Sequence, residues 1–124
     1  MAESEFSEKG RAIQNQLWGE RVSAGTPAAP FATVAPEYAQ LVREFCFGMF
    51  WSRPGLAVRD RSLITVAMLA ALGRHDELRG HLAGALNVGI SKEELVEALM
   101  HVGVYAGVPA AVSALNAAAP VLGG

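Results

Sequence analysis

The chain has 124 residues, of which 52% are hydrophobic and 18% charged, and its formal net charge at pH 7 is −2. This length suits one domain with one core, so we expect a single domain over residues 1–124. A slightly acidic chain without a basic run is not expected to bind nucleic acid. The apolar surplus exceeds what an average soluble domain needs, so part of it should face another subunit.

Two further features bear on the location and redox chemistry of the chain. No uncharged run within one predicted helix approaches the roughly 20 residues needed to cross a bilayer, and the first residues mix acids with bases, which does not suit a secretory signal. The cytoplasm is the expected compartment. The single cysteine, Cys46, excludes an internal disulfide and a thiolate metal cluster within one chain, and its aromatic neighbours favour core packing.

The first half of the chain predicts two helices separated by a loop. A helix is expected over about residues 4–22, beginning at Ser4 or Ser7. A loop should follow over residues 23–36, where a glycine and three prolines forbid a regular element of any length. Pro36 then suits the first turn of a helix that runs to about Trp51. Its buried stripe should comprise Tyr38, Leu41, Val42, Phe45 and Met49.

The second half predicts four more helices. The first starts at Asp60 or just before it, ends at Gly73, and is apolar enough to be central. The next runs from Asp76 to Leu86 or Asn87. Ser91 and Glu94 form a capping box that starts the following helix, which reaches about Ala106. Pro109 in the first turn and Pro120 as terminator bracket an Ala-rich last helix. No segment alternates with period two, so the predicted fold class is all-α, with about six helices.

One histidine, His81, is the chief candidate functional residue. It lies among apolar neighbours on or beside the buried stripe of its helix: Leu78, Leu82, Ala85 and Leu86. A histidine in this position either fills the core, hydrogen-bonded to a carbonyl, or lines a pocket.

Several short motifs occur in order along the chain. They are Trp51-Ser52-Arg53-Pro54-Gly55-Leu56, Arg61-Ser62-Leu63, Leu72-Gly73-Arg74, Glu77-Leu78-Arg79, His81, Ala85-Leu86-Asn87 and Val104-Tyr105-Ala106-Gly107-Val108-Pro109-Ala110-Ala111. Over about residues 36–118 the chain resembles the carboxymuconolactone decarboxylase family. The resemblance implies an alkylhydroperoxidase D-like helical bundle that assembles into homo-oligomers, trimers or hexamers, and a decarboxylase that uses no cofactor. The related alkylhydroperoxidase D branch has a Cys-x-x-Cys pair before its helical histidine, and this chain has none there, which excludes that disulfide chemistry.

The resemblance also implies roles for individual residues. The family's substrate, 4-carboxymuconolactone, is a small dianion that loses a carboxylate, so the site must bind carboxylates and return a proton to carbon. His81 is the expected proton donor, because an imidazole with an unperturbed pKa of about 6.5 can carry a proton at neutral pH. Arg61 and Arg53 are the expected carboxylate anchors. Arg61 could instead pair with Asp76 or Glu77, and Arg53 could be a solvated turn residue.

The remaining candidates are less specific. Glu77, four residues before His81, could orient the imidazole or pair with Arg74 on its own helix. Trp51 and Tyr105 are expected to wall the pocket, although aromatics at helix ends are more often packing residues. Three scattered histidines without an i,i+4 pair do not suit a metal site, so no metal is expected.

The chain departs from the family pattern at a few positions. Decarboxylases of the family usually have glutamate where this chain has Met49, arginine where it has Ala83, asparagine where it has Val88, and a polar residue such as glutamine where it has His101. The first two changes make the expected pocket more apolar, and His101 could supply a different donor. The ligand could therefore carry less charge than carboxymuconolactone.

Three functional hypotheses follow. The first is a cofactor-free lyase acting on carboxymuconolactone or a near relative, a role in aromatic compound catabolism. The second is a diverged enzyme acting on a less charged lactone, enone or polyketide-like intermediate by decarboxylation, isomerisation, dehydration or cyclisation. The third is a non-catalytic oligomeric binding protein, in which His81 is packed without an open cavity.

Overall fold

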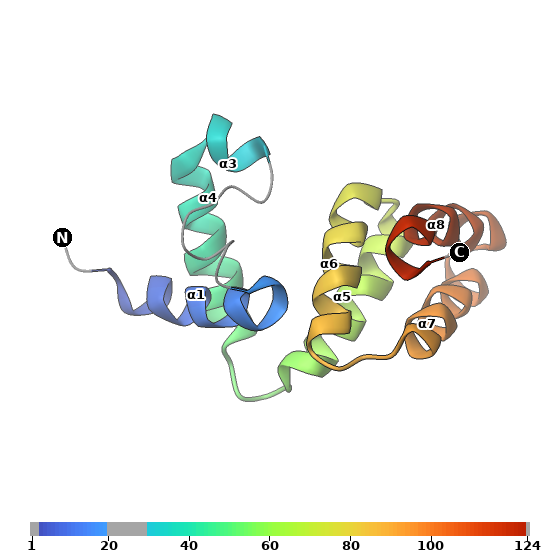
Figure 1. Ribbon diagram of the computed structural model, residues 1–124, viewed down its shortest axis with the longest axis horizontal. Helices are drawn as coiled ribbons and strands as arrows, with labels where there is room; N and C mark the ends of the chain where they lie inside the picture. Colours follow the sequence, from blue (N-terminus) through green and yellow to red (C-terminus); the bar gives the residue numbers. More distant parts are fainter. Residues whose placement is uncertain (1–2, 20–29, 124) are drawn as a thin grey trace. The chain divides into compact units, whose positions relative to one another are not determined.

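The computed structural model describes residues 3–19 and 30–123, and within these ranges every regular element is a helix (Figure 1). The segments are α1 (Glu5–Trp18), α3 (Pro30–Val34), α4 (Pro36–Val42), the π-helix η1 (Arg43–Trp51), α5 (Val58–Leu72), α6 (His75–Asn87), α7 (Lys92–Tyr105) and α8 (Val108–Leu122). The predicted all-α class is confirmed. None of the described helices has the length and apolar character needed to cross a membrane.

The chain folds into two compact units, Met1–Val58 and Arg59–Gly124. Each unit contains helices that pack on one another, and each is described by itself below. The expectation of one domain over residues 1–124 stays a prediction.

In the first unit, α1 has well-defined ends. The Ser4 hydroxyl accepts a hydrogen bond of 3.0 Å from the backbone N–H of Ser7, so Ser4 rather than Ser7 is the N-cap. The helix ends at Gly19, whose φ of +82° favours glycine. Residues 20–22 of the predicted helix lie outside the described residues.

The predicted loop over residues 23–36 is wrong at its end. Residues 23–29 lie outside the described ranges, but Pro30–Val34 form the short helix α3. Pro30 is the first residue of this helix, where the missing N–H of proline removes no intrahelical hydrogen bond. Pro30 and Pro36 therefore begin helices rather than preventing them.

The predicted regular helix from Pro36 to Trp51 is also wrong in its second half, because the chain changes from α to π winding at Arg43. A π-helix bonds residue i to i+5, which shifts the side chains out of the α-helical pattern. Phe45 accordingly contacts Phe50, five residues on, with ring centroids 5.2 Å apart.

The buried side chains of this stretch also differ from the predicted stripe, on α4 as well as on η1. Phe47 and Gly48 are buried, whereas four of the five residues of the predicted buried stripe are exposed: Tyr38, Leu41, Phe45 and Met49.

Two glycines allow the backbones of α1 and η1 to touch. A Cβ atom on Gly48 would lie 2.1 Å from the carbonyl oxygen of Phe6, and one on Gly10 would lie 2.2 Å from that of Arg43. Beside this crossing, the ring of Phe47 meets the edge of Trp18 at 5.6 Å between centroids. Glycine is therefore required at both positions by the approach of neighbouring backbone.

In the second unit, α5, α6, α7 and α8 form a four-helix bundle with short connections (Figure 1). The turn after α5 is the predicted one: Gly73 has a φ of +73°, and the N–H of Arg74 donates to the carbonyl of Leu69 at 2.9 Å. The core comprises buried residues from all four helices and the α6–α7 turn: Val66, Ala70, Leu78, Leu82, Ala85, Ile90, Leu95, Leu99, Val102, Ala114 and Ala118.

The helix α5 is buried on one face only, so the expectation that it is central is wrong for this unit. Ser62, Val66 and Ala70 lie at most 1% exposed along the inner face. The opposite face carries three large apolar side chains that are 46–72% exposed: Ile64, Met68 and Leu72. A helix that is apolar on both faces has more apolar surface than this bundle covers.

Residues at the start of α7 contact the ends of two other helices, α5 and α8. Ser91 and Glu94 form the predicted capping box, with hydrogen bonds of 3.0 and 3.1 Å. Glu94 also pairs with Arg59 near the start of α5, and the Lys92 ammonium donates to the carbonyl of Gly123 just after α8 at 3.0 Å.

The predicted role of Pro120 as terminator is wrong. It lies inside α8, which continues for two residues and ends at Gly123. A proline in the last turn removes only one backbone hydrogen bond, which the packed helix tolerates.

The close approach of α1 and η1 predicts the effect of adding one methyl group. Gly48→Ala should lower the free energy of unfolding by about 1–3 kcal/mol, because the Cβ meets rigid backbone of Phe6 and the two helices must separate. Gly80→Ala in α6 is the matched control, since its Cβ meets nothing within 4 Å and alanine favours helix by up to about 1 kcal/mol. Denaturant unfolding followed by circular dichroism measures both; equal stability of the two variants would contradict the crossing.

Candidate active site

His81 lies in the middle of α6, next to the most deeply buried side chains of the second unit. Leu78, Leu82 and Ala85 on this helix are 0% exposed, and they fix the inner face of α6 against the bundle core. His81 itself is half-buried, and its Nδ1 atom has no significant contact with solvent. The imidazole therefore lies at the edge of the core, with one ring nitrogen turned inward.

Burial sets the charge of this imidazole. Loss of solvent lowers the pKa of His81 to about 4, and the nearby carboxylate of Glu77 only partly opposes this effect. His81 is therefore neutral at pH 7, with one nitrogen as donor and the other as acceptor. Glu77 lies one turn earlier on the same helix, as the spacing of the two residues requires.

Two of the acidic residues near the basic residues of α5 and α6 have identified ion-pair partners, and Arg61 is the partner of neither. Asp76, one of the alternative partners considered for Arg61, pairs with Arg79 on its own helix. Arg61 is half-buried on α5, and its carbonyl accepts a 2.7 Å hydrogen bond from the Thr65 hydroxyl. Arg59, two residues earlier, makes the ion pair with α7.

Two further candidates meet near the end of α7. The rings of His101 and Tyr105, four residues apart, lie with centroids 5.4 Å apart. Tyr105 is 84% exposed and His101 is also exposed. They form a polar aromatic pair on the surface of the second unit.

The last three candidates belong to the first unit and lie in one short stretch. Trp51 ends η1, half-buried, with its ring 5.6 Å from that of Phe47. Met49 is 41% exposed on the same π-helix. Arg53 lies in the following turn, where its N–H donates to the carbonyl of Phe50 at 3.0 Å.

Ser62 is a polar residue that the sequence pattern marks only as part of a motif. It is 0% exposed on the inner face of α5, and its hydroxyl makes no hydrogen bond with any described part of the chain. Buried hydroxyls normally have a partner, so this position is unusual. The signal in the sequence was a lone serine where the helical pattern places a core residue.

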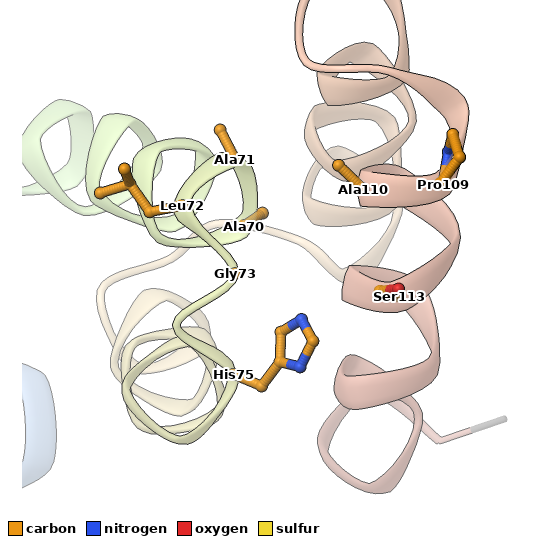
Figure 2. A pocket seen from close by; sticks show the side chains of 8 residues that line it. All are labelled: Ala70, Ala71, Leu72, Gly73, His75, Pro109, Ala110 and Ser113. Atoms are coloured by element: carbon orange, nitrogen blue, oxygen red, sulfur yellow. The ribbon is translucent and has the colours of Figure 1, made fainter.

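A shallow hollow of about 320 Å³ opens elsewhere on the second unit, where α5 ends and α6 and α8 begin (Figure 2). It is lined by Ala70, Ala71, Leu72, Gly73, His75, Pro109, Ala110 and Ser113. The His75 ring projects into it from the first residue of α6. His81 does not line this hollow, and neither do His101 or Arg61.

The chemistry that these groups offer is proton transfer and anion binding. In residues 3–19 and 30–123, no three side chains of His, Cys, Asp or Glu gather closely enough to hold a metal ion. Cys46 is half-buried in η1, where burial raises the pKa of its thiol. A neutral imidazole with a carboxylate one turn away is the arrangement closest to an acid–base site.

Comparison with known proteins gives a family for this chain. The sequence model of the carboxymuconolactone decarboxylase family matches residues 36–120. The chain is 46% identical over 85 residues to the 4-carboxymuconolactone decarboxylase of Acinetobacter baylyi, covering 68% of this chain and 63% of that protein. It is 36% identical over 88 residues to the nitrosuccinic acid decarboxylase of Metarhizium robertsii, covering 71% of this chain and 59% of that protein.

A third relative, an uncharacterised 15.0 kDa protein of Paracoccus denitrificans, is 31% identical over 80 residues, covering 63% of this chain and 60% of that protein. The chain thus spans less than two thirds of the length of the curated relatives that it matches. The family match nevertheless covers more than half of the chain, in the region where the sequence motifs predicted it. The chain belongs to the carboxymuconolactone decarboxylase family.

Proposed function

We propose that this protein is a cofactor-free decarboxylase that acts on 4-carboxymuconolactone or a close relative of it. The observation that carries the proposal is the 46% identity to a protein of that name over 85 residues. The matched region includes α6, which holds the neutral, half-buried imidazole of His81.

The proposed reaction needs no external electron acceptor. The bond between the ring carbon and its carboxylate breaks, CO₂ leaves, and the electron pair moves through the adjacent double bond into the lactone carbonyl. The resulting dienolate then takes a proton on carbon, and His81 is the proposed donor. Arg61 and Arg53 are the proposed anchors for the substrate's carboxylates, with Glu77 orienting His81.

The low pKa of His81 adds a requirement to this mechanism. An imidazole with a pKa of about 4 is almost entirely neutral at pH 7, so the substrate must help to protonate it to imidazolium. A dianion bound beside the ring favours imidazolium, and raising the pKa to about 7 takes about 4 kcal/mol of interaction. Substrate binding and protonation of His81 are therefore coupled in the proposed site.

Three other residues stay proposals for substrate binding. Trp51 and Tyr105 are proposed as walls, and His101, whose ring centroid lies 5.4 Å from that of Tyr105, as an additional donor.

A second candidate function is a decarboxylase, isomerase, dehydratase or cyclase for a less charged lactone, enone or polyketide-like intermediate. It is favoured by Met49, a thioether 41% exposed on η1, and by Ala83, half-buried on α6, because neither can bind a carboxylate. The relative from Metarhizium robertsii, named for a different acid, supports a family in which the substrate varies.

The biological setting is also a proposal. We propose a homo-oligomer, a trimer or hexamer as the family resemblance implies, in the cytoplasm and in aromatic compound catabolism. The exposed apolar face of α5, with Ile64, Met68 and Leu72, supports self-association.

Substitution of His81 tests the proposed chemistry. His81→Gln should lower kcat/KM for 4-carboxymuconolactone by at least about 100-fold, the usual loss when a general acid is removed. Ultraviolet loss of the conjugated lactone measures the rate. His75→Gln is the matched control and should retain wild-type activity. His75 lies on the same helix as His81, but it lines the separate hollow.

Two results would overturn this proposal. Background activity in the wild-type protein would favour the second candidate or a non-catalytic binding protein. Full activity in His81→Gln would remove His81 from the mechanism.

Burial of His81 also predicts a pH dependence of stability. His81 takes up a proton near pH 6.5 in the unfolded chain but only near pH 4 in the folded chain. Its contribution to the free energy of unfolding is therefore fully present above pH 6.5 and is lost as the pH drops toward 4. The contribution of this residue is at most about 3 kcal/mol. Unfolding by urea at pH 7 and pH 4.5 should show a smaller loss for His81→Gln than for the wild type. An identical loss in both proteins would show that His81 is not buried as described.

A further inference from the structure

A stripe of polar side chains runs along the face of α1 that packs on η1. Ser7, Arg11 and Gln14 follow one another at the i, i+4 and i+7 spacing of one helix face. Ser7 is 4% exposed and Gln14 is 8% exposed, although serine and glutamine are mostly exposed in proteins. Arg43, the first residue of η1, reaches this stripe, since its Nε donates to the side-chain oxygen of Gln14 at 2.8 Å. The contact between these two helices of the first unit therefore contains a polar cluster.

One carboxylate, that of Glu3, is bound to this cluster. Its Oε1 accepts hydrogen bonds from the Ser7 hydroxyl at 2.9 Å and from Arg11 Nε at 3.1 Å, and Arg11 Nη2 donates to the same oxygen. Glu3 precedes the N-cap Ser4, so these side chains hold it and the helix does not. The cluster therefore already binds a carboxylate, which a residue just outside α1 supplies.

Several donors of the cluster have no acceptor. In the part of the chain that the structure describes, the two Nη atoms of Arg43 and the amide nitrogen of Gln14 make no hydrogen bond, and this amide nitrogen keeps contact with solvent. Glu44, next to Arg43, accepts instead from the Ser4 hydroxyl at 3.0 Å. Burial and the charge of Arg11 lower the pKa of Arg43, and the charge of Glu3 opposes this only in part. Two guanidinium groups that repel each other and share one carboxylate favour a further anion.

We infer that Arg11, Arg43 and Gln14 form a binding site for a small dicarboxylate, and that Glu3 competes with this ligand for Arg11. Once Glu3 leaves, each guanidinium can bind one carboxylate in its bidentate geometry, and the Gln14 amide offers one further donor. A dianion also balances the two positive charges. The site is made by α1 and η1 and contains none of the residues proposed for the reaction, so it does not depend on the proposed function.

Isothermal titration calorimetry with succinate at low ionic strength tests this site, and succinamate, which has a single carboxylate, serves as the comparison ligand. The wild type should bind succinate with a Kd on the order of 1 mM and bind succinamate at least about 10-fold more weakly. Arg11→Gln and Arg43→Gln should each weaken succinate binding by at least about 10-fold, because hydrogen bonds between charged groups are lost. Arg79→Gln, which removes an exposed arginine from the second unit, is the matched control and should bind like the wild type.

Glu3→Gln is a second variant whose expected effect has the opposite sign. It should tighten succinate binding about 2–5-fold, because the competing carboxylate is removed from an exposed ion pair. Glu3 lies outside α1, so this variant keeps the test valid if an arginine variant unfolds, which circular dichroism detects.

Three results would count against the inference. Absence of succinate binding in both the wild type and Glu3→Gln would overturn the site. Binding unchanged in both Arg11→Gln and Arg43→Gln would also overturn it, because succinate would then lie elsewhere in the protein. Unchanged or weaker binding in Glu3→Gln would overturn the competition. Decarboxylase activity, measured separately, reports on the proposed function.

Discussion

Removal of water from the inner face of α6 is the constraint on which the second unit depends. Leu78, Leu82 and Ala85 are fully buried there, and each large apolar side chain contributes about 1.5–3 kcal/mol to folding. The same loss of water lowers the pKa of His81 and leaves it neutral. The packing that stabilises the bundle and the charge state of His81 therefore have one cause.

The helix ends of the bundle were predictable from the sequence because their signals are local. The capping box of Ser91 and Glu94 and the left-handed turn at Gly73 involve residues within five positions of each other. The π winding of η1 was not predictable in this way. Phe47 and Gly48 are buried by contact with α1, which lies far earlier in the chain. Gly48 lies against Phe6, and no local pattern contains that contact.

The position of His81 beside Glu77 on one helix was predictable from the sequence, but the charge state of His81 was not. A lone imidazole beside an apolar stripe identified His81, and helical spacing identified Glu77 as its neighbour. The direction of the pKa shift depends on how deeply the ring is packed, which is a property of the assembled bundle. The same applies to Arg59, which pairs with Glu94 across two helices, and to the buried hydroxyl of Ser62. Their roles follow from tertiary contacts between residues far apart in the chain.

The two ends of the bundle differ in how they are held. The ion pair of Arg59 with Glu94 and the hydrogen bond from Lys92 to Gly123 both lie at the end where α7 begins. The hollow with His75 lies at the other end, where α6 and α8 begin. Salt weakens exposed ion pairs and leaves apolar packing intact. At low ionic strength the backbone amides near the start of α7 should therefore exchange with solvent more slowly than those around the hollow, and added salt should reduce this difference.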